Sequence, residues 1–197
     1  MRQALRRRAL VCGVAAAGGT LAVAWHLGKP SAPAIAAPEA ATRLRLPGIA
    51  ALRRTDPPVK LPPAALVDAA GIVHGLEDFV GQGLVLNLWA TWCTPCVAEL
   101  PALAALAGRL TAAGILVLPL ASDRGGAPVV EQYSRLHGIA ALPVWLDPKG
   151  AAARAWGARG LPTTLIVDRR GRERGRAEGA VDWAGDAVVA AVRRLVE

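Results

Sequence analysis

Two cysteines separated by two residues, Cys93 and Cys96, lie between two segments of different pattern. Residues 83–90 form an unbroken apolar run of strand length, which is typical of a strand buried on both faces. After the cysteines, apolar residues recur at helical spacing, at Val97, Leu100, Leu103, Leu106 and Leu110. A second apolar strand is expected at residues 115–121, after Gly114. The sequence therefore predicts a strand–helix–strand unit with parallel strands, and the cysteine pair lies where the first strand passes into the helix.

This position favours redox chemistry at the cysteine pair. The first turn of a helix exposes unpaired backbone N–H groups and the positive end of the helix dipole, so the pKa of Cys93 should fall below the free value of roughly 8.5. Cys96 follows on the same helical face and should be the more buried of the two, while Pro95 suits the first helical turn. The predicted reaction is thiol–disulfide exchange, in which Cys93 attacks a partner disulfide and Cys96 resolves the mixed disulfide.

A structural disulfide and half of a metal site are the alternatives for Cys93 and Cys96. A zinc site needs about four ligands, and His74 and His137 are the only histidines in the predicted domain. The sequence therefore predicts no metal, and no cofactor other than a redox-active disulfide between the two cysteines. We interpret the two histidines as surface or packing residues, and Cys12 as a passive apolar side chain.

The formal net charge of +8 is concentrated near the N-terminus. Residues 1–29 contribute +5 and residues 30–59 contribute +2, whereas the chain from Lys60 onward carries 14 basic and 13 acidic residues. This distribution argues against a nucleic-acid partner, which would require an excess of basic side chains on the folded domain. We interpret the remaining basic cluster as a solvated turn between two strands; it consists of Arg169, Arg170, Arg172, Arg174 and Arg176.

The N-terminal residues 1–29 predict a targeting segment. Arginines at positions 6–8 precede residues 9–27, an apolar stretch long enough to span a bilayer as a helix. A retained signal anchor and a cleaved export signal are both open, and either would deliver the rest of the chain outside the cytoplasm. Residues 30–60 are rich in Pro and Ala and predict a linker, so the folded domain is expected to span residues 61–197.

The remaining pattern predicts an α/β domain of three layers. A short hairpin is expected at residues 66–73. The further expected elements are a helix at 129–137, a strand at 143–146, a helical turn at 151–156, a strand at 163–168, a returning strand to about residue 179, and a helix at 183–196. A parallel half followed by antiparallel strands and a terminal helix gives a central mixed β-sheet flanked by helices.

The segment from Trp89 to Pro101, WATWCTPCVAELP, resembles the active-site stretch of TlpA/ResA-like thioredoxins, a family of membrane-anchored, extracytoplasmic thiol–disulfide reductases. The resemblance runs from about Leu61 to Leu195, and Asp182-Trp183 after the last strand is similar to the TlpA branch. It also includes the segments NLW at 87–89 and GLPTT at 160–164. The implied fold is thioredoxin-like, with an N-terminal hairpin and a TlpA-type insertion at residues 122–137.

The resemblance implies further site residues. Pro162 corresponds to the proline that is cis in thioredoxin folds, and a cis peptide there would expose the backbone of Leu161 to a substrate chain. Glu99 corresponds to the acidic residue that the family carries three positions after the second cysteine. That carboxylate could shuttle a proton or tune the pKa of a thiol; the alternative is a first-turn acid favoured by the helix dipole.

Asn87 departs from cytoplasmic thioredoxins, which have a buried aspartate at this point of the strand. An amide accepts no proton, so Glu99 is expected to take the acid–base role. Trp92 is expected to cover the cysteine pair and to form a substrate-docking face together with Thr94, Pro95 and Leu161.

The expected function is that of an extracytoplasmic disulfide reductase, a monomeric enzyme that takes electrons from a membrane thiol donor and reduces a disulfide in a client protein. The resemblance implies clients in cytochrome c maturation or in assembly of the cytochrome oxidase copper site. The same motif also suits a dithiol oxidant or isomerase and, less well, a copper-binding chaperone with two thiol ligands. A peroxidase is disfavoured, because the Pro/Thr/Cys spacing of peroxidatic sites is missing around Cys93.

Overall fold

The structure, a computed structural model, describes residues 46–197. Within this range the strands are β1 (Leu52–Lys60), β2 (Leu66–Asp68), β3 (Val73–His74), β4 (Gly83–Trp89), β5 (Ile115–Ala121), β6 (Trp145–Leu146), β7 (Thr163–Val167) and β8 (Arg172–Glu178). The α-helices are α1 (Thr94–Leu110), α2 (Gly126–Leu136), α3 (Ala151–Ala155) and α4 (Asp186–Val196). Short 3-10 helices are η1 (Ile49–Ala51), η2 (Leu76–Phe79), η3 (Thr111–Ala113) and η4 (Pro148–Gly150).

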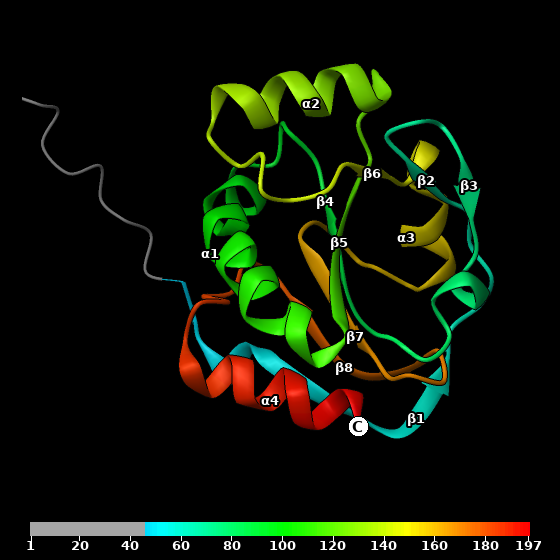
Figure 1. The fold of residues 1–197 in the computed structure, drawn as a ribbon, viewed down its shortest axis with the longest axis vertical. Coiled ribbons are helices and arrows are strands. Elements are labelled where there is room, and N and C mark those ends of the chain that lie inside the picture. The colour runs from blue at the N-terminus through cyan, green and yellow to red at the C-terminus, as the bar shows by residue number, and fades with distance from the viewer. Residues whose placement is uncertain (1–45) are drawn as a thin grey trace, which may run out of the picture. The chain divides into compact units, whose positions relative to one another are not determined.

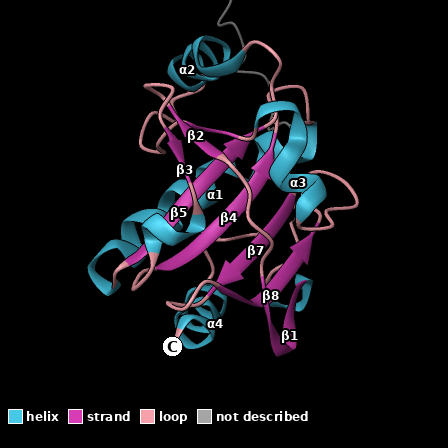
Figure 2. Ribbon diagram, turned by 90° about the vertical axis from the view of Figure 1, so that its right-hand side faces the viewer, coloured by secondary structure: helices cyan, strands magenta, loops and turns pink. Residues whose placement is uncertain are grey.

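All of these strands belong to one mixed sheet in the order β1-β8-β7-β4-β5-β6-β2-β3 (Figure 1 and Figure 2). Strand β4 lies inside the sheet, parallel to β5 and antiparallel to β7. Strand β6 continues the parallel half beside β5, whereas β8 and β1 extend the antiparallel half. All seven residues of β4 are buried, as expected for a strand that is covered on both faces.

Helices cover both faces of the sheet, and the side chains of β4 alternate between two hydrophobic clusters. Val85 and Trp89 belong to the cluster that contains the buried leucines of α1 and the buried valines of α4. Leu84, Leu86 and Leu88 belong to the second cluster, together with residues of η2 and α3. Figure 1 shows α1 and α4 on one side of the sheet and α3 on the other. The predicted three-layer α/β fold is confirmed.

Most of the predicted elements are present, with shifts at their ends. Strands β4 and β5 and helix α1 form the predicted crossover unit, and β2 pairs with β3 in the predicted hairpin. Helix α2 lies in the predicted insertion, where Tyr133 packs edge-on against Trp89 with ring centroids 6.1 Å apart. Helix α4 begins at Asp186 rather than at Trp183, because Gly185 has extended backbone angles at the helix N-cap.

Strand β1 corrects the predicted boundary between linker and domain. The expected linker of residues 30–60 includes residues 52–60, but these residues pair antiparallel with β8 and belong to the sheet. Pro57 and Pro58 fit here because β1 is an edge strand, and its register shifts between Arg54 and Val59. The folded domain therefore begins before Leu61. The predicted targeting segment and residues 30–45 of the linker lie outside the described residues.

The basic cluster is also more ordered than a solvated turn. Arg172, Arg174 and Arg176 are half-buried in β8, and each pairs with an acid: the first two with Asp168 and the third with Glu173. Arg169 donates to the carbonyl oxygens of Gly81 and Ala113. The turn after β7 and the register shift between Ile166 and Val167 bring these arginines beside acidic partners, which the spacing along the sequence alone did not indicate.

One helical segment of the described chain, Thr94–Ala113, is long and apolar enough to cross a membrane by length and composition. Its apolar residues Leu100, Leu103, Leu106 and Leu110 are fully buried against the sheet. The same pattern is expected of a core helix, and its packing explains the apolar composition.

Candidate active site

The cysteine pair lies at the N-terminus of α1, as predicted. Cys93 is the N-cap residue and Pro95 follows within the first turn. A disulfide joins Cys93 and Cys96, whose Cα atoms are 5.3 Å apart. Cys96 is completely buried, whereas Cys93 keeps 7% of its surface exposed. Both residues are buried, and of the two only Cys93 retains surface that a partner can reach.

The backbone around Cys93 is arranged to stabilise a thiolate. An N-cap side chain normally accepts a hydrogen bond from the N–H of the second or third helical residue. Pro95, at the second position, has no N–H, and the third position is Cys96 itself. After reduction, a Cys93 thiolate occupies the place of the capping oxygen, beside the free N–H groups and the positive end of the helix dipole.

The Leu161–Pro162 peptide bond is cis, as predicted. Thr163, the first residue of β7, is the register partner of Leu88 near the end of β4, so Pro162 lies beside the segment that leads to Cys93. The carbonyl oxygen of Pro162 accepts a hydrogen bond from Gly179. Within residues 46–197 the N–H and carbonyl groups of Leu161 have no hydrogen-bond partner. This backbone can pair with an extended chain.

Glu99 lies one helical turn after Cys96 and is completely buried. Its Oε1 accepts a hydrogen bond from Asn87 Nδ2 at 2.8 Å. Its Oε2 accepts two more, from the backbone N–H of Val181 at 2.8 Å and from Trp183 Nε1 at 2.9 Å. Asn87 also donates to Thr164 Oγ1 at 2.9 Å. The alternative interpretation of Glu99, a first-turn acid favoured by the helix dipole, is excluded, because α1 begins at Thr94 and has no acid in its first turn.

The donors around Glu99 are all neutral. Burial raises the pKa of Glu99 above its usual range, while the hydrogen bonds from Val181, Asn87 and Trp183 act in the opposite direction. Because no cation faces the carboxylate among these contacts, the protonated form is much less unfavourable than it would be in an ion pair. A buried carboxyl group with a raised pKa and no counter-charge is suited to proton exchange; that Glu99 exchanges a proton with the cysteines stays a prediction.

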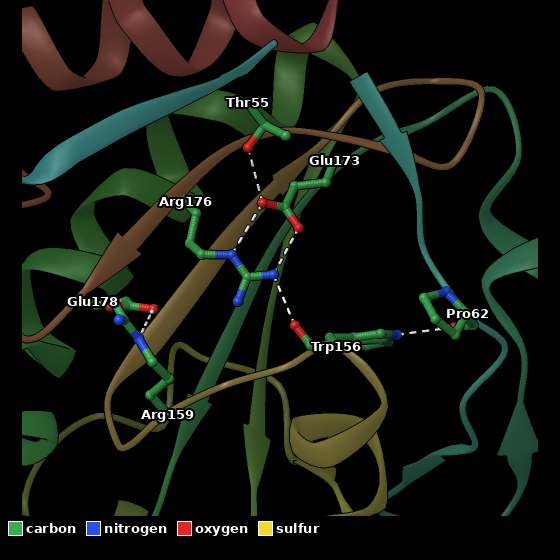
Figure 3. A network of polar contacts seen from close by, with 7 residues as sticks. All are labelled: Thr55, Pro62, Trp156, Arg159, Glu173, Arg176 and Glu178. Carbon is green, nitrogen blue, oxygen red and sulfur yellow. Dashed lines mark hydrogen bonds and ion pairs between the residues drawn. The ribbon is translucent and has the colours of Figure 1, made fainter. Parts of the chain in front are cut away.

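A polar network holds the segment that leads into Pro162 (Figure 3). Arg176 Nη2 donates to the carbonyl oxygen of Trp156 at 2.8 Å, and the same guanidinium pairs with Glu173. Trp156 Nε1 in turn donates to the carbonyl oxygen of Pro62 at 3.0 Å. Arg159 pairs with Glu178.

The network joins β8 to the loop before the cis proline. Thr55 on β1 donates to Glu173 Oε1 at 2.9 Å, which connects the edge strand to the same group. Loop residues that position a substrate are more precise when a rigid scaffold holds them. Arg176 and Glu178 of β8 thus hold the loop that leads to Pro162, through Trp156 and Arg159.

Trp92, Thr94 and Pro95 surround Cys93 on the surface, and Trp92 is 71% exposed. The structure thus brings the predicted site residues together near the end of β4. The two cysteines, Glu99 and Pro162 are buried there, and the more exposed residues around them are Trp92, Thr94, Pro95 and Leu161. Sequence reasoning missed the donors Val181 and Trp183 and the acceptor Thr164. The resemblance of Asp182-Trp183 to the TlpA branch could have indicated Trp183 as a site residue. Val181 donates through its backbone N–H, which every residue except proline has, so the sequence could not indicate it.

His74 and His137 both have packing roles. His74 contacts Asp68 and Asp78, and its ring lies 5.1 Å from that of Trp145. His137 stacks on Tyr133 with ring centroids 4.1 Å apart. Among residues 46–197 no three metal-binding side chains form a cluster; that the protein uses no metal stays a prediction.

The sequence profile of the AhpC/TSA family matches residues 57–174, more than half of the chain. The chain belongs to the AhpC/TSA family. The matched range begins inside β1 and ends inside β8, so it contains both cysteines, Glu99 and Pro162. Family membership and the fold agree with the predicted resemblance to thioredoxin-like proteins.

Several proteins that are similar to this chain in sequence or in structure carry names from thiol–disulfide chemistry. The thiol-disulfide oxidoreductase ResA of Geobacillus thermodenitrificans is 33% identical over 113 residues, which cover 56% of this chain and 63% of the relative. ResA of Bacillus cereus is 32% identical over 114 residues, with the same coverage. The chain thus spans slightly less than two thirds of the length of these curated relatives.

Solved structures support the same placement. A protein from Chlorobium tepidum assigned as the thiol:disulfide interchange protein DsbE superposes with a TM-score of 0.58 at 27% identity, covering 71% of this chain and 94% of the other. The exposed lipoprotein thioredoxin of Streptococcus pneumoniae gives a TM-score of 0.55 at 26% identity, covering 68% and 99%. This AhpC/TSA-family chain therefore has a thioredoxin-like fold.

Proposed function

We propose that the chain is a thiol–disulfide oxidoreductase that reduces the disulfide of a client protein. The observation that carries this proposal is the joint position of the three groups: Cys93 at the exposed helix start, Cys96 buried behind it, and Glu99 one turn further among neutral donors. A structural disulfide has no need of a buried acid or an accessible sulfur. The names of the similar proteins support the same reaction class.

The reaction proceeds in two exchange steps. The Cys93 thiolate attacks one sulfur of the client disulfide, a Cys93–client disulfide forms, and the second client sulfur leaves as a thiolate that takes up a proton. Cys96 then loses its proton and attacks the Cys93 sulfur, which closes the Cys93–Cys96 disulfide and releases the first client sulfur. Two electrons pass to the client, and a dithiol donor must return them.

Glu99 has a defined place in the second step. Cys96 is buried, so its proton cannot pass directly to bulk water. Glu99 lies one turn away on the same helix and, with its raised pKa, accepts this proton and later releases it. The Leu161 backbone pairs with the client chain and holds its disulfide in line with Cys93.

The compartment, the donor and the client belong to the same proposal. An arginine-rich start followed by an apolar stretch supports an extracytoplasmic, membrane-anchored protein, and a similar structure is an exposed lipoprotein. In that location a membrane dithiol protein would supply the electrons. Cysteines of apocytochrome c or of a cytochrome oxidase copper site are the clients that the resemblance favours.

Trapping tests the exchange reaction. The Cys96→Ser variant should hold the client on Cys93 as a mixed disulfide that thiol reagents release, and Cys93→Ser/Cys96→Ser is the matched control. A failure of Cys96→Ser to form any mixed disulfide, even with a small model disulfide, would contradict exchange at Cys93.

The reduction potential of the Cys93–Cys96 pair tests the direction of electron flow. It is measured by equilibration of the purified protein with glutathione buffers. We expect a value more negative than that of the glutathione pool. A value near that of strong oxidants, about −120 mV, would overturn the reductase and leave an oxidant with the same chemistry.

A further inference from the structure

A pocket of about 800 Å³ is lined by Trp92, the residue before Cys93, and by Leu161, the residue before the cis proline. Trp92 forms one wall, residues 122–126 after β5 form the second, and residues 146–161 form the third, with Leu161 at the edge. This volume lies in the usual range of ligand pockets, about 300–1,000 Å³. A chain that reaches Cys93 and pairs with Leu161 therefore contacts two residues of the pocket wall or their direct neighbours.

The charged residues that line the pocket are mostly basic. Arg124, Lys149, Arg154 and Arg159 contribute positive charges, and Asp123 is the one acidic lining residue. The carboxylate of Asp123 is already engaged: it accepts hydrogen bonds from the backbone N–H of Thr91 at 3.1 Å and from Thr91 Oγ1 at 2.6 Å. It is oriented toward the protein and not toward a cation of the pocket.

Three of the four basic side chains lack an acidic partner. Arg159 pairs with Glu178, but Arg124, Lys149 and Arg154 form no ion pair with any residue of the described range 46–197. By contrast, the half-buried arginines of β8 are all paired with acids. The pocket therefore presents a positive potential that the described part of the chain does not neutralise.

Apolar side chains complete the pocket. Trp92 is 71% exposed, a large indole surface left uncovered, and Leu146, Pro148 and Leu161 line the remaining walls. Exposed tryptophan is enriched where one protein binds another, because its ring offers a large rigid contact area. The pocket thus combines an aromatic wall, an unpaired backbone at Leu161 and unpaired cations.

We infer that this pocket binds an acidic segment of the client, in which Asp or Glu side chains lie next to the cysteine that Cys93 attacks. Arg124 and Lys149 attract the carboxylates, Trp92 covers the neighbouring side chains, and the Leu161 backbone pairs with the chain. The inference rests on the proposed function and adds to it the chemical class of client that the enzyme selects.

Matched peptides test this inference with the wild-type protein alone. Three peptides of equal length, each with one internal disulfide, carry two Glu, two Ser or two Lys residues beside the reacting cysteine. The second-order rate constant for oxidation of the reduced enzyme is measured at low salt and at about 1 M salt, where charges are screened beyond about 3 Å. At low salt we expect the Glu peptide to react at least about tenfold faster than the Ser peptide, and the Lys peptide more slowly than both. At high salt the difference should largely vanish.

Charge-reversal variants locate the preference. Arg124→Glu/Lys149→Glu should bring the ratio of the Glu-peptide rate to the Ser-peptide rate to one or below. Lys60→Glu/Arg170→Glu makes the same change in net charge at exposed positions near the opposite end of the sheet, and it should keep the ratio. Arg124→Gln/Lys149→Gln replaces the first variant if that variant does not fold.

The outcomes separate the two proposals. Equal rates for the three peptides in the wild-type enzyme would overturn the acidic-segment inference while leaving disulfide exchange intact. Equal loss of the preference in both charge-reversal variants would show a net-charge effect and would overturn the assignment to this pocket. No reaction with any peptide would contradict the proposed function itself.

Discussion

Two buried carboxylates, Glu99 and Asp168, lie near opposite ends of the central sheet and have opposite surroundings. Glu99 follows the end of β4, whereas Asp168 follows β7 at the end where Val167 pairs with Leu84, the second residue of β4. Both are nearly inaccessible, at 0% and 3% exposure. Glu99 receives hydrogen bonds from neutral donors only. Asp168 receives them from the Arg172 side chain and from two backbone N–H groups, and Arg174 lies 3.5 Å away.

The difference in partners gives the two acids different pKa values. Burial raises the pKa of Glu99, and the neutral donors do not cancel it. Burial also acts to raise the pKa of Asp168, but hydrogen bonds from the Arg172 side chain and from the backbone of Arg172 and Arg170 outweigh it and hold the pKa below its usual range. Burial alone thus does not mark a functional acid. A buried acid without a counter-charge can carry a proton, and one beside arginines serves structure.

The largest expected effect is on catalysis at Glu99. Glu99→Gln should lower the rate of exchange with a model disulfide by about 100-fold near neutral pH, because the proton acceptor for Cys96 is lost. Stopped-flow oxidation of the reduced enzyme measures this rate. Glu77→Gln, at an exposed position, is the matched control and should keep the wild-type rate. An unchanged rate in Glu99→Gln would contradict the role of Glu99 as the proton acceptor for Cys96.

Asp168→Asn tests whether Asp168 stabilises the folded protein through its pairs with arginine. The amide retains an acceptor for the backbone N–H groups but loses the charge that pairs with Arg172 and Arg174, so unfolding should become easier by about 2 kcal/mol at pH 7. Urea denaturation measures it. Asp186→Asn breaks an ion pair in which the aspartate side chain is 95% exposed, and its effect should be much smaller. Equal effects would show that the arginine pairs at Asp168 add little.

The two acids should also respond to pH with opposite sign. A lowered pKa in the folded state means that Asp168 contributes stability above its unfolded pKa of about 3.9 and loses this contribution as the pH falls through the folded pKa. A raised pKa means that the contribution of Glu99 is fully present below its unfolded pKa, about 4.3, and is lost as the pH rises through the folded pKa. The stability of the wild type relative to Glu99→Gln should therefore fall with rising pH, and relative to Asp168→Asn it should rise. Urea midpoints across the acidic and neutral range measure both, and the same slope for the two variants would contradict the comparison.

The smallest expected effect concerns one donor of Glu99. Trp183→Phe removes a hydrogen bond that lowers the pKa of Glu99, so this pKa should rise further and the pH–rate profile should move to higher pH. Stability should fall by about 1 kcal/mol. Trp145→Phe, in the other hydrophobic cluster, is the control and should leave the profile in place. An unshifted profile in Trp183→Phe would show that the hydrogen bonds from Val181 and Asn87 alone set the pKa of Glu99.

Elements that depend on residues close together in the chain were predicted well, and an element that depends on a distant strand was not. Strand β4, helix α1 and the cysteine pair were predicted because apolar periodicity and a local motif encode them within about 30 residues of chain. Strand β1 was missed because its two prolines resemble a linker, and only the partner β8, more than 100 residues away, makes it a strand. The acidic partners of the β8 arginines are an exception, because they lie within six residues along the chain and were still missed. The turn after β7 and the register shift against β7 decide which side chains face each other there, and spacing does not show them.

The sequence by itself determined the reacting pair, the strand–helix junction that holds it and the family to which the chain belongs, since these depend on residues close together in the chain. The family resemblance already indicated Glu99 as the acid, but the tertiary structure alone decided its surroundings. Glu99 meets Asn87, Val181 and Trp183 only after α1 packs on the sheet beside the segment before α4, and no cation comes with them. It likewise decided where the unpaired cations gather, because Arg124 and Lys149 line one pocket only when the ends of β5 and β6 lie side by side.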